Sequence, residues 1–202
     1  MLKLKLGVNS PYTFAFIITL VCICLFYLKL DQQLAYQRPL ILDGQWWRLL
    51  SGNLLHTNAW HLYMNLAGFW VIVALHEQHY RAWGLGVLFL VLCLMQGIGL
   101  LVFYPSLIGY VGLSGMLHGL FTYGAVMDIR GGLKSGYLLL LGVILKVAYE
   151  QIFGASSEMT ELIGARVATE AHLVGLVSGL ICAGALIAFN HLVYKPHSLK
   201  SK

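Results

Sequence analysis

The sequence predicts an all-α integral membrane protein, a single domain over residues 1–202 built as a bundle of six transmembrane helices. Two observations lead to this prediction. Hydrophobic residues make up 59% of the 202 residues and charged residues only 10%, with a mean hydropathy of +0.77, whereas soluble domains carry about 25% charged residues. The apolar residues also gather into stretches close to the ~20 residues that one helix needs to cross a bilayer.

Six apolar segments are expected to form the transmembrane helices. They lie at about residues 12–30, 60–77, 84–104, 114–128, 135–153 and 168–194. The first follows a short basic start, as in a signal peptide, but it is longer than a typical signal-peptide core and no small-residue cleavage site follows it. We therefore expect it to remain as the first span.

The distribution of Lys and Arg predicts that both chain ends face the cytoplasm. In this orientation the cytoplasmic residues are Lys3, Lys5, Arg81, Arg130, Lys134, Lys195, Lys200 and Lys202, and those on the other side are Lys29, Arg38, Arg48 and Arg166. The basic residues flank apolar segments and do not form a stripe, so the net charge of +5 does not indicate nucleic-acid binding. The basic C-terminal tail is expected to contact the lipid surface.

The fourth segment is too short to cross a whole bilayer. Ser114 to Met127 is 14 residues, or about 21 Å of helix, whereas the hydrocarbon core is about 30 Å thick. Ser114 is therefore expected roughly 9 Å below the outer surface of this core. Because irregular backbone at this depth needs surrounding protein or a water-filled cavity, loop 105–113 is predicted to dip into a hollow of the fold.

Ser114 and His172 are polar residues inside apolar segments, and such residues are costly in lipid and usually functional. A serine becomes a useful nucleophile when a neutral histidine acts as its base. Ser114 begins a predicted helix, whose N-terminal amides and dipole favour a developing oxyanion. The two residues are therefore the candidate nucleophile and general base.

Small residues at helical spacing accompany this pair. Gly115 and Gly119 lie on the fourth segment, and Ala171, Gly175 and Gly179 lie on the last. Faces of this kind let two membrane helices approach closely, as a Ser–His hydrogen bond would require. Taken alone, the glycines would be interpreted as ordinary packing sites, but with a serine and a histidine between them we do not favour that interpretation.

A histidine and an asparagine at the start of the second segment are candidate oxyanion donors. His61 and Asn65 are four positions apart and so share one helix face. Imidazole and amide groups are suitable donors to a tetrahedral oxyanion, although an interfacial pair of this kind is more often structural. His56 lies just upstream in an expected loop and would order this region.

No acid is predicted to complete a triad, so a Ser–His dyad is expected. Glu170 is only two positions from His172 and faces largely elsewhere on a helix. Lys146 and Glu150 are four positions apart in the fifth segment, and we interpret them as a structural ion pair. No metal or cofactor is predicted, since the sequence has neither a CxxC motif nor an HExxH motif.

Taken together, these residues resemble a known family. Trp47-Arg48, His56, His61-x-x-x-Asn65, Gly112-x-Ser114-Gly115 and Ala171-His172-x-x-Gly175-x-x-x-Gly179 reproduce the order and spacing found in the rhomboid intramembrane serine proteases, over about residues 12–194. The resemblance implies that Ser114 is the nucleophile and His172 the general base. It also implies that His61, Asn65 and the Ser114 N–H form the oxyanion hole. Trp47, Arg48 and His56 would belong to the first external loop.

One position departs from the common family pattern. Many rhomboids carry a tyrosine four residues after the serine, where this chain has His118. The sequence around His118, together with residues 167–172, resembles the pattern of the bacterial rhombosortase branch of this family. This implies a bacterial inner-membrane protease, open to the periplasm, that cleaves proteins with a C-terminal Gly-Gly motif, one hydrophobic helix and a basic tail. His118 should share a face with Ser114, where it either orients His172 or a water or is simply a polar group satisfied in the cavity.

Two other classes of protein were weighed against a protease of single-span membrane proteins. An inert rhomboid-like protein that binds membrane clients remains the alternative, although inert relatives typically lose the serine or the histidine. A transporter or channel would show matching broken helices in two halves, and the sequence has no such symmetry. Whether the acyl-enzyme passes to water or to an amine acceptor stays open.

Overall fold

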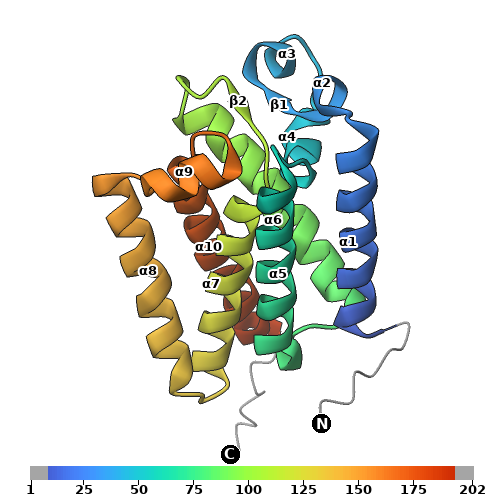
Figure 1. Ribbon diagram of the computed structural model, residues 1–202. Coiled ribbons are helices and arrows are strands. Elements are labelled where there is room, and N and C mark those ends of the chain that lie inside the picture. The colour runs from blue at the N-terminus through green and yellow to red at the C-terminus, as the bar shows by residue number, and fades with distance from the viewer. Residues whose placement is uncertain (1–8, 194–202) are drawn as a thin grey trace, which may run out of the picture.

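The computed structural model describes residues 9–193 and is almost entirely helical (Figure 1). Each predicted segment corresponds to one long helix: α1 Pro11–Leu28, α5 Ala59–Leu75, α6 Ala82–Phe103, α7 Ser114–Arg130, α8 Ser135–Phe153 and α10 Thr169–Val193. Residues 1–8 and 194–202 lie outside the described residues. They include five of the lysines used to predict orientation and the basic tail expected at the lipid surface.

The outer faces of these helices are apolar. Within residues 9–193, α1, α6, α8 and α10 are long and apolar enough to cross a membrane, and α5 is a shorter apolar helix. Only 17% of the most apolar 18-residue window is buried in α1 and in α8, and large side chains such as Phe16, Leu145 and Ile181 are exposed. Apolar surface on this scale indicates contact with lipid, so the chain is a multi-pass membrane protein.

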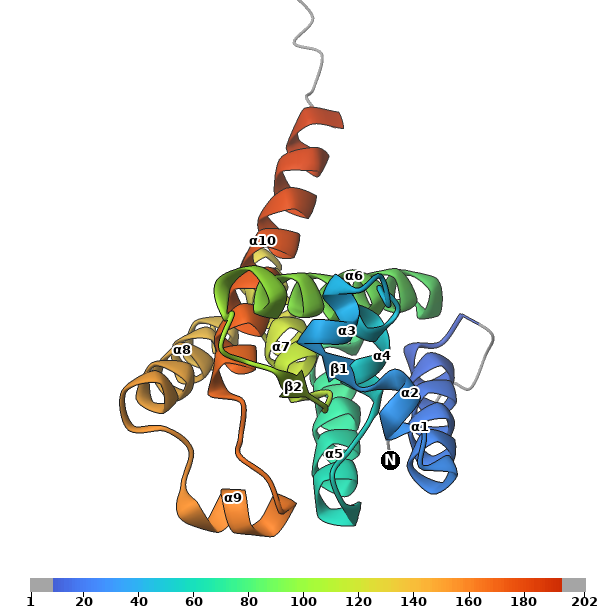
Figure 2. The same cartoon turned by 90° about the horizontal axis from the view of Figure 1, so that it is seen from above.

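Helix α7 lies at the centre of the bundle, where it packs against α5, α6, α8 and α10 (Figure 2). Glycines bring α7 and α10 together, as predicted. A Cβ added at Gly119 would lie 2.8 Å from the carbonyl oxygen of Gly175, and a Cβ at Gly175 or Gly179 would overlap the carbonyl of Gly115 or Gly119. The backbones of the two helices are therefore in direct contact near the start of each.

Short elements connect α1 to α5 at one end of the bundle (Figure 1). They are α2 Asp31–Leu34, β1 Tyr36–Gln37, α3 Arg38–Leu42, α4 Arg48–Ser51 and the 3-10 helix η1 Gly52–Leu54. The Arg48 guanidinium is buried among them and donates at 2.8 Å to the side chain of Gln45 and to the carbonyls of Ala35 and Gln32. One arginine thus holds several turns of this connection in place.

The segment before Ser114 is fixed to the same connection. Strand β2, Gly109–Tyr110, pairs antiparallel with β1, so that Tyr36 lies opposite Tyr110. The Gly112 N–H donates to the Gly52 carbonyl at 3.1 Å. This loop was predicted to be irregular, and it contains one short stretch of β pairing that sets the position at which α7 begins.

Two further short helices complete the described fold. Helix α9, Ser157–Ile163, lies at the end of the bundle that carries the short elements (Figure 1), and the Ser156 hydroxyl caps it by accepting from the Met159 N–H at 3.2 Å. The 3-10 helix η2, Glu77–His79, follows α5. The starting end of α1 and the final end of α10 both lie at the end opposite α9 (Figure 1).

Candidate active site

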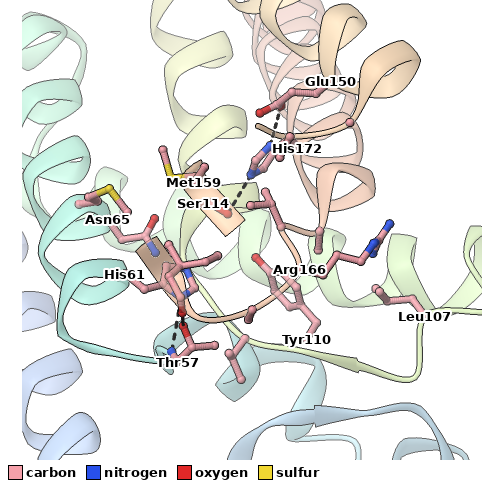
Figure 3. A pocket seen from close by; sticks show the side chains of 18 of the residues that line it. Thr57, His61, Asn65, Leu107, Tyr110, Ser114, Glu150, Met159, Arg166 and His172 are labelled. Carbon is pink, nitrogen blue, oxygen red and sulfur yellow. Dashed lines mark hydrogen bonds and ion pairs between the residues drawn. The ribbon is translucent and has the colours of Figure 1, made fainter. Parts of the chain in front are cut away.

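A cavity of about 890 Å³ opens beside the start of α7. Its lining comes from α5, α7, α8, α9, α10 and the β2 segment (Figure 3). The predicted nucleophile, base, oxyanion donors and His118 all lie in this lining, namely Ser114, His172, His61, Asn65 and His118. Side chains from four long helices therefore converge on one space.

Ser114 and His172 are in direct contact. The Ser114 Oγ lies 3.0 Å from Nε2 of His172 (Figure 3). Ser114 is the first residue of α7, and His172 lies in the first turn of α10 with 5% of its surface exposed. The close approach of the glycine faces lets side chains from these two helix starts share a hydrogen bond.

The prediction that no acid lies beside the histidine is wrong. Nδ1 of His172 lies 2.7 Å from Oε2 of Glu150, on α8 (Figure 3). Because a carboxylate only accepts, Nδ1–H donates this bond and leaves the lone pair of Nε2 facing the Ser114 hydroxyl. Glu170, the acid closest in sequence to His172, instead pairs with Arg166 at 2.5 Å.

The predicted ion pair between Lys146 and Glu150 is confirmed, with Nζ 2.7 Å from Oε1. Since the second carboxylate oxygen binds His172, the interpretation of this pair as purely structural is incomplete. Glu150, His172 and His118 also each offer an atom within 4.8 Å of the others and could hold a metal ion. A cation bound to all three would displace hydrogen bonds that these groups make with one another and with Ser114.

His118 contacts both members of the Ser–His pair. Its ring stacks on that of His172, with centroids 4.1 Å apart and an interplanar angle of 18°. Its Nδ1 lies 2.7 Å from the Ser114 carbonyl, and because a carbonyl only accepts, Nδ1–H is the donor. The His172 ring is therefore held on one face by His118 and at its edge by the Glu150 carboxylate.

The candidate oxyanion donors line the same cavity as Ser114. The side chain of Asn58 caps α5 by accepting from the His61 N–H at 2.9 Å, which places His61 and Asn65 on successive turns. Gly112 has φ +128°, and a Cβ there would lie 2.7 Å from His61 Nε2 and 3.7 Å from Asn65 Nδ2. The Asn65 Nδ2 is buried and has no hydrogen-bond partner among residues 9–193.

His56 lies in the loop before α5 and packs against one of the candidate oxyanion donors. Its ring is 4% exposed and packs edge-on against His61, with centroids 5.1 Å apart. Burial, with a smaller contribution from a charge on His61, lowers the pKa of His56 to about 3. His56 is therefore neutral at ordinary pH and acts as a packing group.

Two features of the site lie outside the sequence prediction. Thr57 Oγ1 lies 3.0 Å from His61 Nδ1 and donates to the Ile163 carbonyl at 2.6 Å, which ties α9 to the start of α5. Met159 and Ile163 of α9 line the cavity. The sequence did carry a signal for α9, since Ser156 is a favoured N-cap and Gly164 adopts the left-handed conformation that ends the helix.

Comparison with known proteins relates this chain to one family. The family model described as "Rhomboid domain" matches residues 43–189. The chain is 31% identical over 142 residues to "Rhomboid protease GlpG" of Photorhabdus laumondii, which covers 68% of this chain and 46% of the relative. It is 28% identical over 184 residues to "Rhomboid protease GlpG" of Klebsiella pneumoniae, covering 86% of this chain and 62% of the relative.

A third relative is "Rhomboid protease GluP" of Bacillus subtilis, 28% identical over 156 residues. The match covers 75% of this chain but only 28% of that relative. The chain thus spans less than two thirds of the length of these three relatives. Since the domain model matches residues 43–189, well over half of the chain and including Ser114 and His172, the chain belongs to the rhomboid family.

Proposed function

We propose that this chain is an intramembrane serine endopeptidase that cleaves transmembrane proteins. The observation that carries the proposal is the Ser114 Oγ, 3.0 Å from Nε2 of His172, inside a cavity that is also lined by His61 and Asn65. A nucleophile, a base and donors for an oxyanion are the groups that acyl transfer needs. The names of the relatives as rhomboid proteases agree with this assignment.

The reaction would proceed through an acyl-enzyme. As the Ser114 oxygen attacks the scissile carbonyl carbon, its proton moves to Nε2 of His172. The carbonyl oxygen becomes an oxyanion that accepts hydrogen bonds from the Asn65 amide, from His61 and from the Ser114 N–H. His172 then returns the proton to the amide nitrogen that leaves, and water or another amine attacks the acyl-enzyme in the same way.

The membrane arrangement follows from the same proposal. All six long helices would be transmembrane spans of one domain, with α5 and α7 as the shorter ones. An even number of spans places both chain ends on one side of the membrane. The starting end of α1 and the final end of α10 lie at the same end of the bundle, in agreement with this arrangement (Figure 1). With that side cytoplasmic, the cavity would open toward the periplasm from the inner membrane.

The substrate is proposed to be a single-span protein of the rhombosortase type, with a Gly-Gly motif before a hydrophobic helix and a basic tail. This assignment rests on the sequence resemblance around His118 and residues 167–172. The cavity of about 890 Å³ beside Ser114 offers space for a segment of such a substrate. Glycines at the scissile bond would let the backbone approach the serine closely.

The test uses the purified chain in lipid vesicles with such a reporter and with a second single-span reporter that lacks the glycines. We expect cleavage near the glycines by the wild type and none by Ser114→Ala, as read from the intact masses of the products. Equal cleavage by Ser114→Ala would contradict the protease assignment. Cleavage of only the second reporter would retain the protease and reject the Gly-Gly substrate, whereas binding without cleavage of either would favour an inert client-binding protein.

A further inference from the structure

The Glu150 carboxylate has two partners, a histidine and a lysine. Both of its oxygens are engaged, Oε2 by His172 Nδ1 and Oε1 by Lys146 Nζ, each at 2.7 Å. Its side chain is 13% exposed, whereas that of Lys146 is 52% exposed. The lysine is therefore the more exposed partner of the carboxylate, whereas the histidine partner, whose side chain is 6% exposed, is buried. Figure 3 shows the bond between Glu150 and His172.

A carboxylate at this position can assist a general base in two ways, by selecting its tautomer and by stabilising its protonated form. A neutral imidazole has two tautomers, and only the one with its proton on Nδ1 can accept the serine proton at Nε2. A bond from Nδ1–H to Glu150 selects that tautomer and fixes the plane of the ring. When the imidazolium forms in the transition state, the adjacent negative charge also stabilises it.

The geometry points to Glu150 as a positioning residue that acts through His172, so that the site works as a Ser114–His172–Glu150 triad supplied by α7, α10 and α8. This inference rests on the proposed protease function. It assigns a specific task to α8, which packs against α7 and α10 and brings the acid to a base on another helix. Lys146 is then a counter-ion that holds the second carboxylate oxygen.

The competing account is that Glu150 only neutralises Lys146. The two accounts predict different results in a double-mutant cycle. If Glu150 serves only the lysine, Lys146→Met combined with Glu150→Gln removes both charges and restores activity. If Glu150 serves His172, the double variant stays as slow as Glu150→Gln alone, because the histidine lacks its acceptor carboxylate in both.

The experiment measures kcat and KM for a single-span reporter in vesicles with wild type, Glu150→Gln, Lys146→Met and the double variant. We expect Glu150→Gln to lower kcat about 10²- to 10⁴-fold, as loss of the acid does in other triads. KM should change by less than about threefold, since the interaction strengthens only in the transition state. Lys146→Met should lower kcat far less than Glu150→Gln, by no more than about fivefold, because the carboxylate loses its counter-ion but keeps its contact with His172.

Glu170→Gln is the matched control, because it also removes a carboxylate near His172 but one that pairs with Arg166. It should retain kcat within about fivefold. Thermal unfolding in detergent reports the folded fraction. If Glu150→Gln is poorly folded because it leaves Lys146 unpaired, the double variant, which has no unpaired lysine, is used to distinguish the two accounts.

A kcat for Glu150→Gln within about tenfold of the wild type, or recovery in the double variant, would overturn the triad. Ser114→Ala and His172→Ala are run in parallel. If they abolish cleavage while Glu150→Gln does not, only this inference fails. If Ser114→Ala still cleaves, the proposed function itself fails.

Discussion

The contact between α7 and α10 predicts that one methyl group added to a residue that takes no part in the chemistry will slow the reaction. Gly175 lies one turn after His172 on α10, and a Cβ there would overlap the carbonyl oxygen of Gly115, next to Ser114. Ordinary contacts between such atoms begin near 3.5 Å, so Gly175→Ala must separate the helices by on the order of 1 Å. The 3.0 Å bond between Ser114 and His172 spans this same interface.

A misplacement of about 1 Å can cost roughly 10²-fold in rate, and this is the fall in kcat that we expect for Gly175→Ala. Overpacking should also lower the free energy of unfolding by about 1–3 kcal/mol. Gly119→Ala should have a smaller effect, because its Cβ would lie 2.8 Å from the Gly175 carbonyl. Gly184→Ala is the control on the same helix, since its Cβ would meet no atom within 4 Å among the described residues.

The assay is steady-state cleavage of a single-span reporter in vesicles, together with thermal unfolding in detergent. The expected order of kcat is wild type and Gly184→Ala highest, then Gly119→Ala, then Gly175→Ala. If Gly175→Ala were as fast as Gly184→Ala, the α7–α10 contact would not set the geometry of the Ser–His pair, and this reasoning would be refuted.

Three further predictions concern groups around the same cavity. Asn65→Ala should lower kcat about 10²- to 10³-fold with little change in KM, because one oxyanion donor is lost; an unchanged kcat would exclude Asn65 from the oxyanion hole. His118→Tyr should keep kcat within about fivefold, since a tyrosine ring can still stack on His172, whereas His118→Ala should lose more than about tenfold; equal rates would show that the stacking is irrelevant. The low pKa of His56 means that the unfolded chain binds more protons than the folded chain between about pH 6.5 and 3. The stability contribution of His56 is thus complete above pH 6.5 and is lost on acidification, so His56→Phe should flatten the decline of melting temperature over that range. A variant that declines as steeply as the wild type would contradict this assignment.

The long helices were predictable because each depends on a local property, a run of apolar residues near the length of a bilayer crossing. The meeting of Ser114 and His172 was also predictable, because small residues at helical spacing mark where two helices approach. Both signals can be read along a single segment. For this reason the sequence predicted the frame of the site and its central hydrogen bond.

Glu150 was missed for the opposite reason. It lies 22 positions before His172 on another helix, and spacing along a chain says nothing of which faces of two helices meet. Considering acids close in sequence directed attention to Glu170, which pairs with Arg166 instead. Helix packing, which a single sequence does not display, determined which carboxylate contacts the histidine.

The connection before α5 was hidden for a different reason. Its helices are three to five residues long, too short for periodicity to reveal. Arg48 was expected in the first external loop, and nothing in the sequence indicated that it is 3% exposed and bonded to two carbonyls and a side-chain oxygen. A buried charge of this kind is stable only with such partners, and they come from residues that only the fold brings together.

The central claim is that Ser114 is a nucleophile activated by His172, and covalent labelling tests it most directly. The chain in vesicles would be treated with a fluorophosphonate, which reacts with activated serines, and the labelled residue would be located by peptide mass mapping. We expect label on Ser114 in the wild type, a large loss of labelling in His172→Ala and none on residue 114 in Ser114→Ala. Label on a different residue, or equal labelling of Ser114 without His172, would contradict the account.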